Sequence, residues 1–310
     1  MAFETPYNFP GRSATPAAYD PVRADLQRIQ HQIFPGLDKP SASNNGAPAL
    51  TYGEHTCGGW EIAWAQIVGP SHRISEDSLG YAMHCRYDAP GPDKHASHGV
   101  SLVLADGVGG GARGDIASHA LVRHCLAIGS LHANANATHP GLLLEGLSTA
   151  DSAVNRSLAA RTPLPGAATL AAAWLDSRAQ GWISRVGDAR LSIWNIHTGQ
   201  LLPLLADQSY ANLGELPPHP SHWSAPARMV GAGLMGAPEV HPLSLAAQEI
   251  LMLSSDGLHQ WLSSADTLPR QGVSGTRLAD FAQALAMHAR ETGSDDDISV
   301  LLLRAPNPIS

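Results

Sequence analysis

Residues 99–110 read Gly-Val-Ser-Leu-Val-Leu-Ala-Asp-Gly-Val-Gly-Gly. The first seven form a short apolar run, which is typical of a buried strand, and the run ends at Asp106-Gly107 before a cluster of glycines. Residues 115–128 then carry apolar side chains at helical spacing. This stretch predicts a strand that ends on a carboxylate, followed by a turn and a helix.

Working outward, six more segments show the pattern of short strands, and two more show that of helices. The expected strands are residues 60–64, 169–175, 182–186, 191–194, 249–253 and 298–303, and the other expected helices are residues 142–160 and 277–290. Strands follow strands repeatedly, and helices lie between groups of strands. This order indicates an α+β fold rather than strict βαβ alternation.

Composition restricts the classes of function. The chain has 310 residues, 44% of them hydrophobic, which suffices for a large core and excludes wholesale disorder. The net charge of −8 argues against general nucleic-acid binding. Cys57, Cys85 and Cys125 are too sparse for a disulfide framework. With no signal peptide and no membrane-length apolar stretch, we expect a cytoplasmic protein without a membrane partner.

Two segments differ from the rest of the chain. Residues 1–50 are rich in Pro, Ser, Ala and Asn, which predicts a flexible leader with one short helix near residues 21–33. Residues 51–310 would then form the folded domain. Within it, residues 208–240 are rich in Pro and Gly, so we expect a long loop there.

Acidic residues recur at the predicted strand ends, beside glycine or a polar turn. They are Glu76-Asp77, Asp106-Gly107, Gly187-Asp188, Asp256-Gly257 and Asp296-Asp297. Each alone is typical of a solvated surface. Together, gathered at one edge of a sheet, they would repel one another unless a cation lay between them. Oxygen ligands of this kind suit hard divalent ions such as Mg²⁺ and Mn²⁺.

In order and rough spacing, six motifs resemble those of the metal-dependent Ser/Thr protein phosphatases (protein phosphatase 2C-like), in their bacterial form. The motifs are Arg73-Ile-Ser-Glu-Asp-Ser78, Leu104-Ala-Asp-Gly-Val-Gly-Gly110 with Gly114-Asp-Ile-Ala-Ser118, Gly166-Ala-Ala-Thr-Leu170, Val186-Gly-Asp-Ala-Arg190, Leu253-Ser-Ser-Asp-Gly-Leu258 and Asp296-Asp-Ile-Ser-Val300. The resemblance implies a four-layer αββα sandwich, in which two antiparallel sheets are flanked by helices. It also implies that residues 208–240 take the place of the family's flap.

The resemblance assigns a set of metal ligands. Asp106 would bridge two ions, with the Gly107 carbonyl on one of them, and Asp256 and Asp296 would complete the first ion's ligands. Glu76 and Asp77 would serve the second ion, and Asp188 a third, weaker one shared with Asp256. The ions would be Mg²⁺ or Mn²⁺. The implied reaction is hydrolysis of phosphoserine and phosphothreonine in proteins by a metal-bridging hydroxide, without a phosphoenzyme.

Two positions depart from the family. Val108 stands where some members carry an acidic His, so no general acid can be assigned. His72 stands where the family has a phosphate-binding Arg, and Arg73 comes one residue late. Neighbouring side chains of an extended segment face opposite sides, so only one of the two can face the metals. We expect His72 to do so, with an unperturbed pKa near ~6.5, while Arg73 covers the rim.

Other interpretations compete with this one. The domain could be a catalytically weak regulator that keeps the fold and binds phosphoproteins. Gly109–Gly114 matches a dinucleotide fingerprint, but no Asp or Glu lies between Asp115 and Glu145 to bind the ribose. The sixteen histidines, including His84 and the pair His95 and His98, do not make a compact zinc set.

Three further expectations concern the tryptophans, Arg190 and the partners of the protein. The tryptophans inside predicted strands are expected to pack in the core. Arg190, close to Asp188, is expected to form an ion pair rather than to contact substrate. The expected partners are phosphorylated proteins, possible substrates of a bacterial Ser/Thr kinase, and the expected state is a monomer.

Overall fold

The structure is a computed structural model that describes residues 49–87, 96–109, 112–135, 139–262 and 277–306. The predicted leader, residues 1–50, and its short helix near residues 21–33 therefore lie outside the described residues, except for positions 49 and 50. His95 also lies outside them.

The first sheet is antiparallel throughout its described length. In spatial order its strands are β1 (Leu50–Cys57), β2 (Trp60–Ile67), β13 (Ile298–Arg304), β12 (Glu249–Ser254), β9 (Arg190–Asn195) and β10 (Leu201–Pro203). The sheet thus joins segments from the two ends of the described chain, because β13 pairs with β2 on one side and with β12 on the other.

The second sheet is antiparallel as well. Its strands, in spatial order, are β11 (His241–Ser244), β8 (Gln180–Val186), β7 (Leu170–Leu175), β4 (Ala96–Ala105) and β3 (Ser78–Tyr87). A two-residue pairing of β5 (Gly107–Val108) with β6 (Ala167–Ala168) continues the line of β4 and β7 beyond the sheet. These antiparallel connections do not form the βαβ unit that a dinucleotide fingerprint requires.

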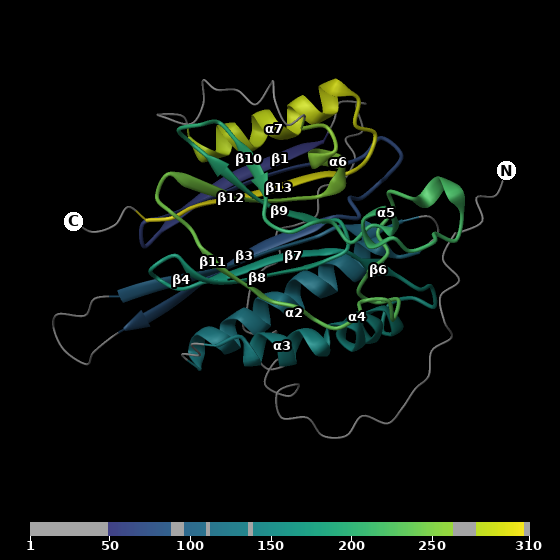
Figure 1. The fold of residues 1–310 in the computed structure, drawn as a ribbon, viewed down its shortest axis with the longest axis horizontal. Helices are drawn as coiled ribbons and strands as arrows, with labels where there is room; N and C mark the ends of the chain where they lie inside the picture. The colour runs from purple at the N-terminus through teal and green to yellow at the C-terminus, as the bar shows by residue number, and fades with distance from the viewer. Residues whose placement is uncertain (1–48, 88–95, 110–111, 136–138, 263–276, 307–310) are drawn as a thin grey trace.

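Helices cover the outer face of each sheet, as Figure 1 shows. On the second sheet lie α2 (Gly114–Asn134), α3 (Gly141–Ser148) and α4 (Ala150–Ala159), and on the first lies α7 (Leu278–Thr292). Short helical turns α5 (Tyr210–Leu213), η1 (Pro220–His222) and α6 (Asp256–His259) lie in the connections. The predicted four-layer αββα sandwich, an α+β fold, is confirmed.

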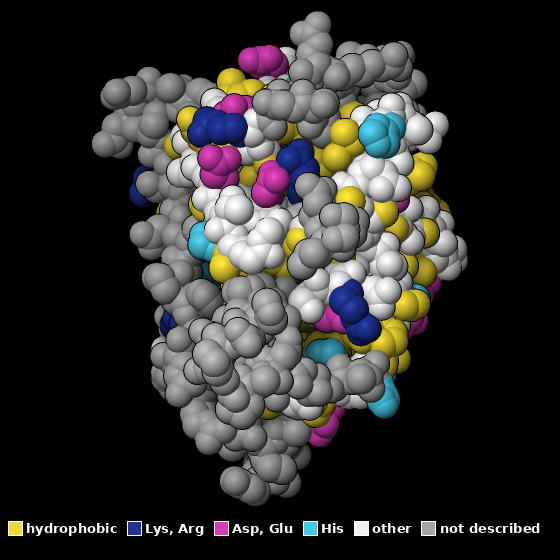
Figure 2. Space-filling view, turned by 90° about the vertical axis from the view of Figure 1, so that its left-hand side faces the viewer, with side chains coloured by type: hydrophobic (Ala, Val, Ile, Leu, Met, Phe, Trp, Pro, Cys, Tyr) yellow, Lys and Arg dark blue, Asp and Glu magenta, His cyan; other side chains and the backbone are white. Residues whose placement is uncertain are grey.

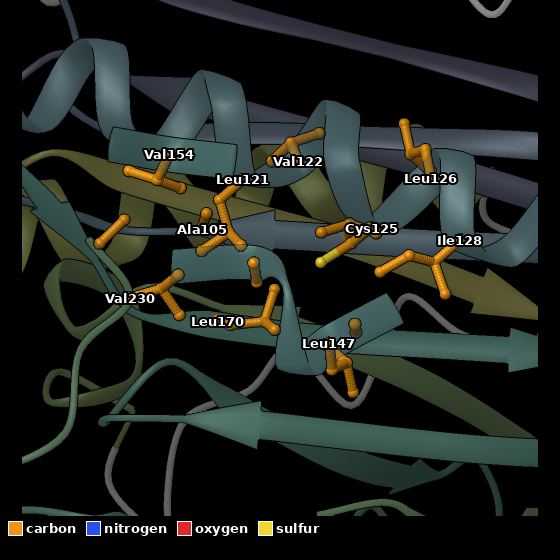
Figure 3. Close-up of a cluster of buried hydrophobic side chains, with 14 of the residues drawn as sticks. Ala105, Leu121, Val122, Cys125, Leu126, Ile128, Leu147, Val154, Leu170 and Val230 are labelled. Atoms are coloured by element: carbon orange, nitrogen blue, oxygen red, sulfur yellow. The ribbon is translucent and has the colours of Figure 1, made fainter. Parts of the chain in front are cut away.

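Three apolar clusters hold the layers together. One lies between the two sheets and includes Trp60, Leu102 and Leu251. A second lies between α7 and the first sheet. The third joins α2, α3 and α4 to the second sheet, and Figure 3 shows Leu121, Cys125 and Leu170 among its side chains. Burial of this apolar surface is the main force that holds the helices on the sheets.

The predicted elements are present, with corrected limits. The single helix expected over residues 142–160 is two helices, α3 and α4, which meet at Thr149. The Thr149 hydroxyl donates to the carbonyl of Gly146 and lies 3.3 Å from Nε2 of His124, so local polar contacts interrupt an otherwise regular apolar pattern. The packing expected of the tryptophans is confirmed at Trp60, Trp174 and Trp194, which are buried.

The outer surface carries mixed charge on the face shown in Figure 2, where Arg or Lys side chains lie close to Asp or Glu among hydrophobic ones. Within the described part of the chain, no helix combines the length and the apolar character needed to cross a membrane.

Candidate metal centre and active site

A cavity of about 360 Å³ opens at one end of the sandwich. Six carboxylates contribute to its wall: Glu76, Asp106, Asp188, Asp256, Asp295 and Asp296. The remaining wall includes His72, Gly107 and Thr169. Six of the seven predicted metal-ligating residues, all except Asp77, thus line the cavity together with the predicted phosphate contact His72.

Strand register explains why these residues meet. In the second sheet, Leu170 pairs with Val186, and Ala171 pairs with Leu104, so Asp106, Thr169 and Gly187 lie at the same end. In the first sheet, Ser254 pairs with both Val300 and Arg190, which places Asp256 and Asp296 at that end too. Asp188 lies on the connection from β8 to β9, where the chain crosses from one sheet to the other.

Asp106 is the most strongly perturbed acid of the cavity. Burial, with the nearby charges of Asp77, Asp256 and Asp188, raises the pKa of Asp106 well above its usual range. The Asp256 carboxylate lies within hydrogen-bonding reach of Asp106, and burial raises its pKa to about 6. Without a cation, burial and the neighbouring acids therefore favour the protonated form of the Asp106 carboxyl.

Two further acids of the wall behave in the same way. Burial and the charge of Asp256 raise the pKa of Asp188 to about 8. Burial raises the pKa of Glu76 to about 7, although His72 opposes the shift. Several converging carboxylates that repel one another when ionised, with Gly107 beside them in the wall, are a donor set that fits a hard divalent cation.

Gly107 brings the backbone close to these acids. A Cβ added at Gly107 would lie 2.5 Å from the Glu76 carbonyl oxygen and 2.6 Å from the backbone of Gly114. In the same way, a Cβ added at Gly114 would lie 2.7 Å from the carbonyl carbon of Gly107. The two glycines allow β5 to pack against the start of α2, which keeps the Gly107 carbonyl at the cavity wall.

The segment that carries Glu76 is held by Asp297, whose role the sequence analysis did not identify. The buried Asp297 carboxylate accepts hydrogen bonds from the backbone N–H of Gly69 and of Glu76, each at 2.6 Å. His72 Nδ1 lies 2.9 Å from Oδ2 of Asp297, the same oxygen that accepts from Glu76. Ligand atoms of His72, Asp296 and Asp297 lie within 4.8 Å of one another. The three consecutive acids 295–297 were the signal in the sequence, but spacing alone could not rank them.

Asp297 also sets the charge of His72. The hydrogen bond with Asp297 raises the pKa of His72 to about 9, well above the ~6.5 expected from sequence. His72 Nε2 lies 4.0 Å from a Glu76 oxygen. The imidazole is thus held by its Nδ1 side, and in the protein without bound cations it is positively charged at neutral pH.

Asp77, Arg73 and Val108 differ in their relation to the cavity. Asp77 is buried beside the hydroxyls of Ser299 and Ser255 and does not line the cavity, although its charge affects Asp106. Arg73 is exposed and is not part of the wall, whereas His72 is. Val108 lines the wall and offers no proton.

Two arginines that are close in sequence to wall residues have acidic partners. Arg190 forms an ion pair, as expected, but with Asp207 at 2.5 Å and not with the neighbouring Asp188. Arg113 pairs with Asp115 at 2.6 Å at the start of α2. Among the described residues, His72 is the basic side chain of the cavity wall.

Thr169 is a second residue that the sequence analysis quoted without a role. It is buried and lines the cavity, and its hydroxyl has no hydrogen-bond partner among the described residues. The motif Gly166–Leu170 includes the position, but the burial of an unpartnered hydroxyl there depends on packing that local sequence does not reveal.

Solved structures with similar folds are bacterial phosphatases. The PPM Ser-Thr phosphatase MsPP from Mycobacterium smegmatis is 24% identical over 79% of this chain and 97% of its own, with a TM-score of 0.59. The S. agalactiae serine/threonine phosphatase is 23% identical over 79% and 99%, with a TM-score of 0.61. PppA, a regulatory component of T6SS in Pseudomonas aeruginosa, is 25% identical over 79% and 97%, with a TM-score of 0.56.

No protein-family model matches the chain, and no curated protein matches it by sequence. The similarity is therefore one of three-dimensional structure, spread over nearly the full length of each of the three proteins. The two antiparallel sheets, their flanking helices and these neighbours together show that the chain has the fold of the PPM Ser/Thr phosphatases.

Proposed function

We propose that this chain is a metal-dependent protein phosphatase that hydrolyses phosphoserine and phosphothreonine in proteins. The observation that carries the proposal is the convergence of Asp106, Asp188, Asp256 and Asp296 from separate strand ends onto one cavity. The fold neighbours support it, and the PstP catalytic domain, 21% identical, is solved with two manganese ions. Such a set of acids destabilises the protein unless it binds a cation, which favours a functional origin.

The proposed ligands divide by position. Asp106 shares the cavity wall with Glu76 and Asp256, which suits an acid that serves two ions, with the Gly107 carbonyl on one of them. Asp256 and Asp296 would complete the first ion, and Glu76 the second. Asp77, behind the wall, would act on the second ion through water. Asp188 would hold a third ion together with Asp256.

The chain's own residues account for the rest of the chemistry. Asp106 and its neighbours must release their protons when cations bind, so binding should strengthen as pH rises. His72, held through Nδ1 by Asp297, presents Nε2 as a donor for a phosphoryl oxygen. Bound divalent cations would supply an activated water and polarise the phosphoryl group. Water then displaces the serine or threonine oxygen from phosphorus.

A metal titration tests the proposal. The full-length chain, stripped with EDTA and dialysed, should release phosphate from a phosphothreonine peptide only after Mn²⁺ or Mg²⁺ is restored. A reagent that alkylates cysteine should leave turnover unchanged, because the reaction has no cysteine nucleophile. Full turnover in chelated buffer would disprove the metal-dependent mechanism. Tight binding of the phosphopeptide without turnover at saturating Mn²⁺ would favour the regulatory alternative.

A further inference from the structure

Thr169 occupies a special place at the cavity. It lies between β6 and β7, and its backbone N–H donates to the carbonyl oxygen of Asp106 at 2.8 Å. Asp106 in turn lies between β4 and β5. The pairing of β4 with β7 and the pairing of β5 with β6 are therefore separated by one residue on each side, Asp106 on one and Thr169 on the other. Thr169 and Asp106 therefore face each other where the second sheet ends.

The other side of Thr169 contacts the connection that carries Asp188. A Cβ added at Gly187 would lie 2.6 Å from the Thr169 methyl group, Cγ2. Gly187 has a φ of +87°, a conformation that favours glycine. Both this backbone conformation and the close contact with Thr169 therefore require a residue without a side chain. With its methyl against Gly187 and its backbone on Asp106, Thr169 stands between two proposed ligand positions.

The hydroxyl of Thr169 is left without a partner in the described protein. The residue is 1% exposed, and its Oγ1 makes no hydrogen bond to a described residue. A buried hydroxyl without a partner costs free energy on the order of 1–3 kcal/mol. Six of the thirteen residues that line the cavity are acids. A hydrated cation held by those carboxylates would bring a water molecule that pairs with the hydroxyl.

We propose that the Thr169 hydroxyl positions a cation held by Asp106, by hydrogen bonding to a water molecule in the ion's coordination shell. This inference rests on the proposed function and adds a residue to it. Threonine can both donate and accept a hydrogen bond, which suits a water whose other contacts are the ion and a carboxylate. Thr169 is a positioning residue in this proposal and does not contact phosphorus.

The test compares Thr169→Val, which keeps the shape and removes the hydroxyl, with Thr169→Ser, which restores it. Mn²⁺ binding to the metal-stripped full-length chain is measured by calorimetry, and thermal unfolding is followed with and without Mn²⁺. Outer-shell partners of metals are typically worth ~10–100-fold in affinity. We therefore expect Thr169→Val to weaken one class of Mn²⁺ sites about tenfold, and Thr169→Ser to recover most of the loss.

The unfolding temperature separates this role from a structural one. Removing a hydroxyl that has no protein partner should leave the metal-free Tm unchanged or raise it, while the increase in Tm on adding Mn²⁺ shrinks. Ser192→Ala is the matched control, because Ser192 is also buried with an unpartnered hydroxyl but lies outside the cavity wall. It should bind Mn²⁺ like the wild type.

Three results would overturn the proposal. In the first, Thr169→Val binds Mn²⁺ as tightly as the wild type. In the second, Thr169→Val lowers the metal-free Tm and Thr169→Ser does not restore affinity, which would show a structural role only. In the third, the wild type itself binds no Mn²⁺ and hydrolyses no phosphopeptide, which would reject the proposed function together with this inference.

Discussion

Burial and the charges of Asp77, Asp256 and Asp188 raise the pKa of Asp106 well above its usual range, so function and stability oppose each other at this residue. Asp106→Asn should reduce kcat/KM by more than the ~10–100-fold typical of outer-shell partners, because it weakens two ion sites at once. In EDTA at pH 8 the same variant should unfold at a higher temperature than the wild type, because a buried acid has been removed.

Asp188→Asn provides the comparison for this prediction. Asp188 would serve only a third ion, so the variant should keep most of its turnover at saturating Mn²⁺. Phosphate release measured against Mn²⁺ concentration separates the two variants. Equal inactivity of Asp188→Asn and Asp106→Asn would contradict the ranking of the sites.

The phosphate contact gives a second prediction at the scale of single residues. His72 lines the cavity and is charged through its contact with Asp297, whereas Arg73 is exposed outside the wall. A hydrogen bond to a charged group contributes ~1.5–3 kcal/mol, so His72→Ala should raise KM for a phosphopeptide about tenfold or more, with a smaller effect on kcat. Arg73→Ala is the control and should resemble the wild type. The reverse order of effects would assign the contact to Arg73.

At the scale of elements, all seven strands expected from the sequence are interior strands of the two sheets. They correspond to β2, β13, β12 and β9 in the first sheet and β8, β7 and β4 in the second. The four described edge strands, β1, β10, β11 and β3, were not predicted. An interior strand is confined by neighbours on both sides, which enforces an apolar pattern. An edge strand such as β1 is largely exposed and lacks that pattern.

Part of the candidate site could be predicted from the sequence for a related reason. Asp106, Asp188 and Asp256 follow interior strands, and Asp296 precedes one. Strand ends of antiparallel sheets meet at common edges, so these four acids could be placed together. The burial of Asp77, the hydrogen bonds of Asp297 and the orientation of Thr169 depend on packing between segments far apart in the sequence. The periodicity of one segment carries no information about those contacts.

The glycines at the junction of β5 and α2 yield a prediction at this scale. Gly107→Ala would force a Cβ against the backbone of Glu76 and Gly114, where no flexible side chain can move aside. We expect a loss of ~1–3 kcal/mol in the free energy of unfolding and a weaker response to Mn²⁺. Chemical denaturation with and without Mn²⁺ measures both.

Gly141→Ala is the opposite case. Gly141 begins α3, and an added Cβ would meet nothing within 4 Å. Alanine favours a helix over glycine by ~0.5–1 kcal/mol, so this variant should be slightly more stable and bind Mn²⁺ normally. Equal effects at the two positions would show that the close contact at Gly107 does not constrain the cavity.

At the scale of the whole molecule, the cavity links the two sheets at the end where β8 gives way to β9. The charge of the cavity should therefore influence the stability of the entire sandwich. In the metal-free folded chain the pKa is about 7 for Glu76, about 8 for Asp188 and well above its usual range for Asp106. The unfolded chain ionises these groups near pH ~4.

Between pH 6.5 and 8.5 the folded metal-free chain thus binds more protons than the unfolded chain, so its stability must fall as pH rises. His72, with a pKa raised to about 9, adds to the fall, because its stabilising charge is lost as pH rises through that value. Burial lowers the pKa of His84 and His124 to about 4 and that of His259 to about 3. A lowered histidine pKa makes stability rise with pH, which is the opposite effect. Those histidines are neutral in both states above pH ~6.5, so they do not affect this interval.

Cations should reverse this trend. Fewer protons must be displaced at higher pH, so Mn²⁺ binds more tightly and stabilises the folded chain more. In EDTA the Tm should fall by about 5 °C or more from pH 6.5 to 8.5, whereas in saturating Mn²⁺ it should stay level or rise. Thermal unfolding in both buffers measures the difference. Parallel pH profiles with and without Mn²⁺ would mean that the buried acids and the cations do not occupy the same site.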